Sequence, residues 1–417
     1  MAGGLGRPFW TVWSAGIISY AGDGLVSGAM PVIAASITRD PRQIALVEFF
    51  ETAGWLVVGL LAGVVADRVQ RLTLMWRVDL IRALVLLGYV TLVALGWESI
   101  ALLCGLGLLL GLAAPFHDSA QGSLAPDLVT DEHLERANSL NQVALLFAAM
   151  LIAPPIGAIW ATASHTMPFL LDAVTFAVAA VLLWRLASSH LVRAHMQPPA
   201  PEPVAAAPGI VWAELREGLS YLWRQRGLRT LAIAAGMING ISGGIVSILV
   251  LYVSTDLGLP DTAYGFAMAL FALGGVLGAV VAEPLVHRLG AQLAVLTSLG
   301  SFSAAAFGLG LLVAPAPAAL ALVIAGFGGL LWNVVTVTYR HRVVPRALLG
   351  RVTSTYRLIA FAGMPLGAVL AGFLAHFLGS IPVVYVMGGA ALLLTTAFVW
   401  PGLRDLDAHS AKLGQVG

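Results

Sequence analysis

Long apolar stretches run through this chain of 417 residues and limit its fold more than any other feature. A helix needs about 20 consecutive apolar residues to cross the hydrocarbon core of a bilayer. We count twelve such stretches, at approximately 10–37, 44–66, 73–97, 100–121, 139–162, 167–187, 228–254, 263–286, 291–314, 316–339, 353–377 and 380–400. The sequence therefore predicts an all-α membrane protein with twelve transmembrane helices.

Composition favours the same class. The mean hydropathy is +0.91, and only 10% of the residues are charged, which is far from the usage of soluble domains. The short alternating segments of a membrane β-barrel are absent from the sequence. Because lipid cannot hydrogen-bond to the backbone, helices are the remaining way to span the membrane.

Basic residues predict the orientation, because Arg and Lys are retained on the cytoplasmic side. With the N-terminus inside, only Arg39 and Arg42 fall in outer loops, which leaves 20 (22 minus 2) on the inner side. We expect both termini to be cytoplasmic. The apolar run after Arg7 is too long for a signal peptide and contains Asp23.

The chain divides into two halves of six helices. We expect an N-terminal bundle at 1–187, a cytoplasmic linker at 188–227, a C-terminal bundle at 228–402 and a cytoplasmic tail at 403–417. The linker starts rich in Pro and Ala and continues as IVWAELREGLSYLWRQRGLRT, whose apolar residues recur at helical spacing. This pattern predicts an amphipathic helix on the inner membrane face.

The two halves resemble each other, as the internal repeats of transporters do. An inner loop leads into a helix containing APPIGA in the first half, and into one containing MPLGAVLAG in the second. Arg136 with Ser139 matches Arg351 with Ser354. We interpret the chain as a duplicated six-helix unit.

Four stretches carry a family resemblance: GVVADRVQR (63–71), PFLLDAVTF (168–176), ELREGLSYLW (214–223) and the long segment 332–372. The chain resembles the major facilitator superfamily, and within it the branch that includes the enterobactin exporter and macrolide efflux proteins. The resemblance implies two pseudo-symmetric six-helix bundles, transport by alternating access and a bacterial inner membrane location. Gln70 stands where the family signature has glycine, and Gln121 stands where this branch commonly has Arg.

The signature stretch places charges between two apolar runs. In alternating access two bundles rock about a central site, so the inward-closed state needs contacts at the cytoplasmic rim. Asp67 is expected to cap helix 11, and Arg68 and Arg71 to pair with Asp127 or other acids of the next inner loop. The expected latch consists of Gly63, Asp67, Arg68, Arg71, Arg136 and Arg351. A plain solvated loop is the alternative.

Acidic residues inside the predicted spans are candidates for proton coupling, because intramembrane charges are rare and mostly functional. Asp23 lies near mid-bilayer, where loss of solvation favours the protonated carboxyl. Glu51 is a second candidate proton or cation site. Asp172 is the third, with a structural hydrogen bond as an equal alternative. For Asp23, the alternative is a capped polar group between Gly22 and Gly24.

Other charged residues are given structural roles. Asp79 and Arg82 are spaced i, i+3 and are expected to neutralise each other. His117 and Asp118 are expected near an inner helix end, as gate residues in contact with water or as interfacial residues. The candidate substrate cavity is lined by Trp13, Tyr20, Asn239, Phe271, Trp332 and Asn333, although aromatic residues in membrane helices more often serve packing.

The sequence lacks a Walker lysine motif, HExxH and a Cys/His ligand cluster, so we expect no enzyme activity, no metal and no cofactor besides a proton gradient. The leading hypothesis is a proton-coupled exporter (antiporter) of a hydrophobic or amphipathic small molecule such as a drug, siderophore or natural product. The alternatives are a proton-coupled importer of a small nutrient or metabolite, or a membrane receptor. The expected partners are the small-molecule substrate, protons and membrane lipid, without nucleic acid, and the expected state is a monomer.

Overall fold

The computed structural model describes residues 5–189, 208–345 and 348–413, apart from the side chains of Leu60, Asp67, 208–214 and 404–413. Within these residues the chain is helical and has no strand, which confirms the predicted all-α class. The chain forms two compact units. Unit 1 consists of Met1–Arg39, Phe50–Val204 and Asp261–Ala269, and unit 2 of Asp40–Phe49, Ala205–Pro260 and Leu270–Gly417.

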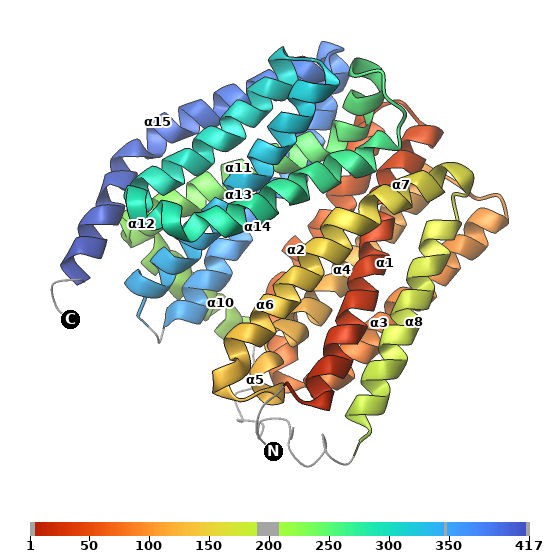
Figure 1. The fold of residues 1–417 in the computed structure, drawn as a ribbon, viewed down its shortest axis with the longest axis horizontal. Helices are drawn as coiled ribbons and strands as arrows, with labels where there is room; N and C mark the ends of the chain where they lie inside the picture. The colour runs from red at the N-terminus through yellow and green to blue at the C-terminus, as the bar shows by residue number, and fades with distance from the viewer. Residues whose placement is uncertain (1–4, 190–207, 346–347, 414–417) are drawn as a thin grey trace. The chain divides into compact units, whose positions relative to one another are not determined.

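The first half of the chain supplies the helices drawn from red to yellow-green in Figure 1. They are α1 (Arg7–Ile37), α2 (Pro41–Arg68), α3 (Arg71–Ala94), α4 (Ile100–Gly122), α5 (Ala125–Leu128), η1 (Asp131–His133), α6 (Leu134–Ala144), η2 (Leu145–Ile152), α7 (Ala153–Ala163) and α8 (Met167–Ala187). The predicted span 139–162 is thus a longer, composite helix with a π-helical segment, η2, just before APPIGA.

The second half supplies α10 (Pro208–Arg224), α11 (Arg226–Leu251), η3 (Tyr252–Asp256), α12 (Ala263–Leu311), α13 (Pro315–Val343), α14 (Leu349–Leu378) and α15 (Ile381–Leu413). A helix therefore lies where the sequence predicts the amphipathic segment. The last helix continues past residue 400 into the segment predicted as a tail, as far as Leu413.

Nine helical stretches of the described chain are long and apolar enough to cross a membrane. One of them, α12, contains two predicted spans, 263–286 and 291–314, because Gly290 breaks the helix with a φ of 80°. Such a φ is readily adopted only by glycine. The helices α2 and α3 have 28 and 24 residues. The arrangement is consistent with twelve spans.

Local sequence explains where several helices begin and end. The Ser99 hydroxyl accepts a hydrogen bond from the Leu102 N–H at 3.2 Å and caps the start of α4. Pro168 occupies the first turn of α8, where its missing N–H has no helical partner in any case. Gly379 ends α14 in the left-handed conformation at φ 64°.

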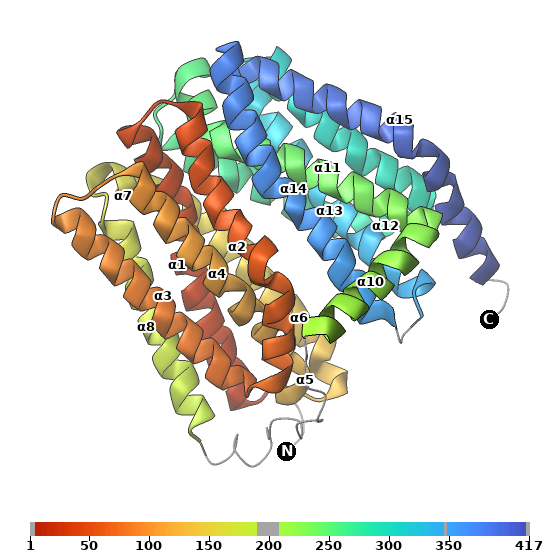
Figure 2. The ribbon, with the colours of Figure 1, turned by 180° about the vertical axis from the view of Figure 1, so that it is seen from behind.

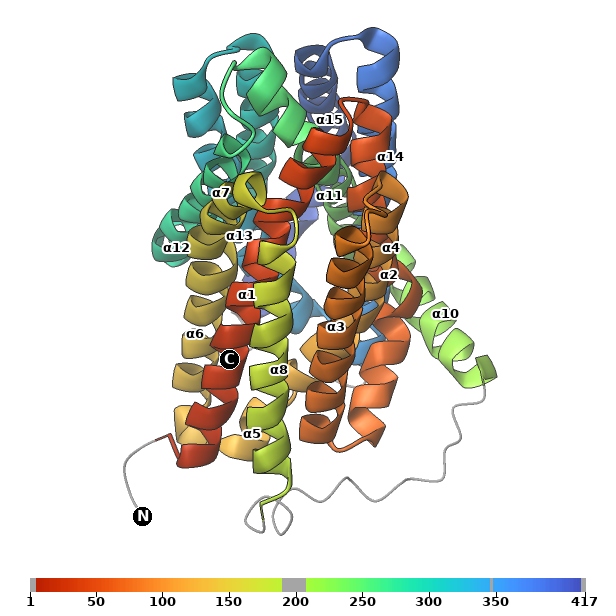
Figure 3. The same ribbon diagram turned by 90° about the vertical axis from the view of Figure 1, so that its right-hand side faces the viewer.

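Unit 1 is built around α1, which packs between α7 and α8 (Figure 1). Small residues allow the close approach: a Cβ on Gly28 would collide with the Pro154 backbone, and a Cβ on Gly157 with that of Leu25. The third helix, α3, lies along α8 (Figure 3). These contacts place one face each of α1, α3, α4 and α8 in the interior of the unit.

Unit 2 is built around α11, which packs between α14 and α15 (Figure 2). Gly240 on α11 meets Gly363 and Gly367 on α14, and a Cβ on either of these two α14 glycines would collide with the backbone of Gly240. Such glycine contacts are the usual means of close helix packing in membranes. The core of this unit contains Leu231, Trp332 and Tyr356 among other buried residues.

Candidate functional site

A cluster of charged side chains is buried inside unit 1. Asp79 and Arg82 on α3, His117 on α4 and Asp172 on α8 are each no more than 3% exposed. Burying a charge costs free energy unless a partner compensates for it. Four such residues in one apolar bundle therefore indicate a site with a purpose beyond packing.

Asp79 and His117 form the centre of this cluster. The His117 Nε2 atom lies 3.5 Å from the Asp79 Oδ1 atom, and the His117 Nδ1 atom lies 3.6 Å from Asp118 Oδ1. Both Asp79 carboxylate oxygens lack a hydrogen-bond partner among the described residues. A buried carboxylate without a hydrogen bond is costly, and it is chemically suited to accept a proton.

Arg82 contributes the positive charge. Its guanidinium carbon lies 5.1 Å from the centre of the Phe176 ring, and its Nε is buried without a hydrogen-bond partner among the described residues. Asp79 and Arg82 are in electrostatic range of each other but form no hydrogen bond. The expectation that these two residues simply neutralise each other is thus too simple, because His117 also faces Asp79.

The three predicted coupling residues lie at this cluster. Asp23 on α1 is half-buried and is in electrostatic range of Arg82, Asp118, His117 and Asp79. The side chain of Asp172 lies directly against Gly22, and its Oδ1 accepts a hydrogen bond from Thr175 at 3.0 Å. Glu51 on α2 is in electrostatic range of Asp23. The helices α1, α2, α3, α4 and α8 thus each bring an acidic residue to the same region of unit 1.

Gln121 lies at the edge of the cluster, at the position where related sequences commonly carry Arg. Its Oε1 accepts a hydrogen bond from the Tyr20 hydroxyl at 3.0 Å. A Cβ on Gly16 would lie 3.2 Å from its Nε2, so the amide also packs on α1. A neutral amide replaces the expected cation here, and Arg82 on α3 supplies a buried positive charge instead.

Sequence analysis missed Asp79, Arg82 and His117 as site residues. Of the two alternatives for His117, a gate residue in contact with water is wrong, because its side chain is 2% exposed, whereas that of Asp118 beside it is 43% exposed. In a helix that is apolar on all sides, the sequence does not show which face is buried. The one available signal is that all three residues are ionisable and lie within predicted spans.

The six predicted cavity residues belong to different units. In unit 1, the Trp13 indole N–H donates to the Leu140 carbonyl at 3.1 Å, and Tyr20 belongs to the charged cluster. In unit 2, Asn239 donates to the Ala235 carbonyl at 2.9 Å, and Trp332 is buried in the core. The remaining two are the half-buried Phe271 and the exposed Asn333.

The predicted latch residues make local contacts in each unit. The Arg71 Nη1 atom lies 2.5 Å from Asp127 Oδ2, one of the pairings that the sequence predicts. Arg351 on α14 pairs at 2.5 Å with Glu217 on α10, a partner that sequence analysis did not name. Arg68 and Arg136 are exposed, a Cβ on Gly63 would meet no neighbour, and the Asp67 side chain lies outside the described residues.

The two arginines that the sequence predicts in outer loops are both paired with acids. Arg39 makes two hydrogen bonds to Asp261, at 2.8 and 2.7 Å, between segments 222 positions apart in the chain. Arg42 donates to Asp40 at 2.8 Å. This hydrogen bond holds the pKa of the Asp40 carboxyl below its usual range.

No group of three or more His, Cys, Asp or Glu side chains suited to a metal ion occurs among the described residues. The charged cluster of unit 1 has one histidine beside carboxylates and one arginine. These side chains can form ion pairs with one another, and the carboxylates and the histidine can each bind a proton.

A family model and several known proteins match almost the whole length of this chain. Residues 6–412 match the family model described as "Transmembrane secretion effector". The multidrug efflux pump Tap of Mycolicibacterium fortuitum is 26% identical over 97% of this chain and 98% of its own length. The enterobactin exporter EntS of Escherichia coli O81 is 25% identical over 93% of this chain and 89% of its own.

Solved structures show the same fold at low identity. A bacterial homologue of the iron transporter ferroportin, in an inward-facing state, has a TM-score of 0.72 and 18% identity, over 96% of this chain and all of that one (100%). The nucleoside transporter NupG has a TM-score of 0.73 at 10% identity, over 95% of this chain and 99% of that one. All of these similar proteins are membrane transporters.

Proposed function

Since the chain belongs to the major facilitator superfamily of membrane transporters, and is not an enzyme, we propose that it exports a hydrophobic or amphipathic small molecule in exchange for protons. The proposed substrate is a molecule such as a drug, a siderophore or a natural product. Transport proceeds by alternating access about a central site. The proposed location is a bacterial inner membrane, with both termini cytoplasmic and the protein acting as a monomer.

The proposed direction of transport rests on the relatives. Two of them that align over most of this chain are named as a multidrug efflux pump and an enterobactin exporter. Both names describe export of small organic molecules from the cell. Import of a nutrient, the alternative function, is not what either name describes.

Proton coupling rests on one observation, the buried charged cluster of unit 1. Asp79, His117 and Asp172 are almost completely buried, and Asp23 and Glu51 lie within electrostatic range of the same group. Protonation of one carboxylate changes the net charge that the bundle must bury, so it changes the relative free energies of two conformations. Asp23 is the proposed exchanging carboxylate, with Glu51 and Asp172 as secondary sites.

Proton exchange can be measured in everted vesicles that hold an acidic interior. Ethidium, a hydrophobic cation, is added, and proton release is followed with a pH-sensitive dye beside ethidium accumulation. We expect wild-type vesicles to accumulate ethidium and release protons. Asp23→Asn should abolish both while expression and ethidium binding persist, because the amide keeps the shape of the side chain but does not titrate. Glu51→Gln should have the weaker effect.

Two controls separate the alternatives. Vesicles without the protein give the passive leak of ethidium and protons. An importer would empty preloaded everted vesicles instead of filling them. Wild-type proton release by Asp23→Asn would contradict the assignment of Asp23, and loss of coupling in Glu51→Gln alone would move the proton site to α2.

A further inference from the structure

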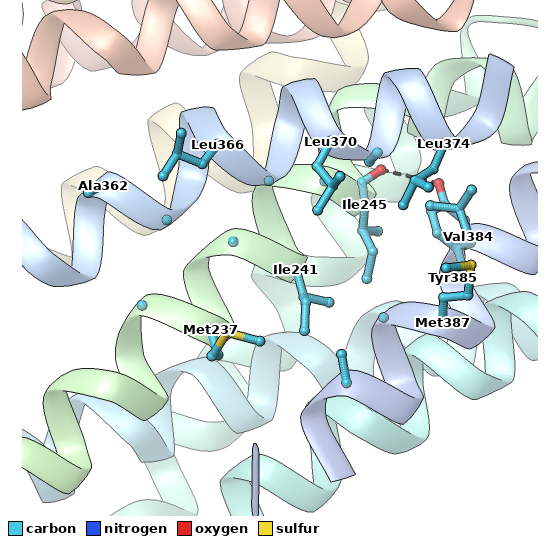
Figure 4. Close-up of a pocket in the computed structure, with 18 of the residues that line it drawn as sticks. Met237, Ile241, Ile245, Ala362, Leu366, Leu370, Leu374, Val384, Tyr385 and Met387 are labelled. Atoms are coloured by element: carbon cyan, nitrogen blue, oxygen red, sulfur yellow. Dashed lines mark hydrogen bonds between the residues drawn. The ribbon is translucent and has the colours of Figure 1, made fainter. Parts of the chain in front are cut away.

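An apolar groove of about 530 Å³ lies in unit 2 between α11, α14 and α15. Figure 4 shows Met237, Ile241 and Ile245 on one wall and Leu366 and Leu370 on another. The lining consists of aliphatic residues, glycines, two methionines and one tyrosine. This groove is separate from the charged cluster, which belongs to unit 1.

The hydroxyl of that tyrosine already has a hydrogen-bond partner. The Tyr385 hydroxyl donates to the Ile245 carbonyl at 3.1 Å, as the dashed line in Figure 4 marks. Leu366 and Leu370 are 66% and 60% exposed, so the groove opens on the surface of the unit. The lining therefore suits a hydrocarbon chain, which has no hydrogen-bonding groups to satisfy.

Small residues create the groove. Gly363 and Gly367 let the backbones of α14 and α11 come together, because a Cβ on either residue would collide with the backbone of α11. On the third wall, α15 presents Gly388 and Ala391 instead of large side chains. The space that these residues leave is not filled by the described side chains.

A second cavity, of about 340 Å³, lies at the end of α11 where that helix begins. It is lined by Arg226, Arg229 and Trp223 together with residues of α15 such as Phe398. The Arg229 Nη1 atom donates to the Trp223 carbonyl at 3.2 Å, and a guanidinium has further N–H donors. Ile233 lines both cavities, so the basic cavity and the apolar groove are adjacent.

We propose that this pair of cavities binds an anionic phospholipid, with the phosphate held by Arg226 and Arg229 and an acyl chain in the apolar groove. Basic pockets between transmembrane helices are suited to anionic head groups. Tryptophan favours the membrane interface, and Trp223 is 47% exposed. The two cavities thus match the two chemical parts of one lipid molecule.

The length of the groove agrees with one leaflet. Ile245 lies twelve positions after Ile233 on α11, which is about 18 Å at 1.5 Å per residue. Half of a bilayer core about 30 Å thick is roughly 15 Å. A chain that starts at the arginines would therefore reach the middle of the membrane within the groove.

The test is native mass spectrometry of the full chain in a mild detergent. The protein is mixed in turn with phosphatidylglycerol, phosphatidylcholine and glycerol 3-phosphate, and bound lipid is counted on the intact protein. We expect phosphatidylglycerol to bind in preference to phosphatidylcholine. Since a basic residue near the membrane surface contributes enough to change affinity about fivefold, Arg226→Gln and Arg229→Gln should each weaken phosphatidylglycerol binding by about that factor.

Matched variants separate the two parts of the site. Arg224→Gln removes the same charge two residues before Arg226, from a side chain that does not line the cavity. This variant should bind lipid as wild type does. Arg229→Lys should retain part of the preference for the anionic lipid. Ile241→Trp, which fills the groove, should weaken binding of both phospholipids while leaving the melting temperature close to that of wild type.

Three outcomes would overturn the proposal. Equal binding of the two phospholipids would remove the role of the arginines. Displacement of phosphatidylglycerol by glycerol 3-phosphate at similar concentration would show a site for a soluble anion. Unchanged lipid binding in both the Arg226→Gln/Arg229→Gln and Ile241→Trp proteins would show that the lipid binds elsewhere.

Discussion

Asp79 is the residue whose surroundings are hardest to explain by stability alone. Its carboxylate is fully buried, faces His117 at 3.5 Å and has no hydrogen bond among the described residues. A carboxylate with only a structural role would normally be hydrogen-bonded. Because it lies beside a histidine, we expect the Asp79–His117 pair to share a proton during transport.

The first prediction is that Asp79→Asn loses most of the proton-driven transport while the protein still folds. The amide removes the charge that faces His117 and Arg82 but keeps nearly the same volume. Transport in everted vesicles at matched expression is the measurement. Asp118→Asn is the control, because that exposed carboxylate also faces His117, and it should retain more activity. Equal activity of Asp79→Asn and wild type would make the buried pair structural.

Gly22 offers a second prediction, about stability. A Cβ at this position would collide with Asp172 and Thr175, both of which pack against α1. Gly22→Ala should therefore lower the free energy of unfolding by about 1–3 kcal/mol, as overpacking does. Gly88→Ala is the matched control on α3, because a Cβ there meets no neighbour and alanine favours a helix. Thermal melting in detergent measures both, and equal melting temperatures would contradict the packing argument.

At the scale of the helices, the sequence predicts positions well and faces poorly. The apolar stretches predict the helices, and the spacing of Leu215, Leu219 and Leu222 predicts α10, because each signal is local. By contrast, which side of α3 or α4 is buried depends on packing between helices that are apolar all round. Gly290 is visible in the sequence, but its φ of 80° is a property of the folded chain.

The same limit applies to the partners of charged residues. Arg71 and Asp127 lie in neighbouring predicted inner loops, so the sequence predicts their pairing. The structure confirms the contact. Arg351 and Glu217 are 134 positions apart, so only the packing of α10 on α14 brings them together. That packing is close, since a Cβ on Gly218 would lie 2.5 Å from the Arg351 carbonyl oxygen.

A third prediction concerns this contact between α10 and α14. Arg351→Ala should change protein stability by less than about 1 kcal/mol, because the pair is largely exposed. It should nevertheless slow transport, because the pair fixes α10 on a helix of the transporting bundle. Exchange of the charges, Arg351→Glu with Glu217→Arg, should restore part of the rate in vesicle assays.

A failure of the exchanged pair to recover would contradict this interpretation. If Arg351→Ala slows transport and the charge exchange does not help, the arginine acts through another contact, since it has further interactions beyond Glu217. Glu217→Gln provides the matched control. It removes the acceptor charge and should reproduce the effect of Arg351→Ala if the ion pair is what matters.

At the scale of the whole molecule, the compact units do not follow the halves of the sequence completely. Unit 1 takes residues 261–269 from the second half, and unit 2 takes residues 40–49 from the first. Each unit therefore holds a short segment that belongs, by sequence, to the other repeat. The Arg39–Asp261 pair ties such a segment to unit 1, because the Nη1 and Nη2 atoms of Arg39 donate to the two carboxylate oxygens of Asp261.

The last prediction follows from the proposed alternating access. Arg39 comes from the first repeat and Asp261 from the second, 222 positions later in the chain. If the two repeats move against each other during transport, we expect this contact to break in every cycle. We expect Arg39→Cys with Asp261→Cys, joined by a short thiol-reactive crosslinker, to stop ethidium accumulation in vesicles, and a cleavable crosslinker to allow recovery on reduction. Cys104 is the one natural cysteine and is buried, so labelling reports the introduced pair.

Either single cysteine variant, treated with the same reagent, should keep its transport rate, because no link between the two positions can form. Full transport by the crosslinked protein would mean that this contact persists through the cycle, and that the movement of the repeats takes place around it.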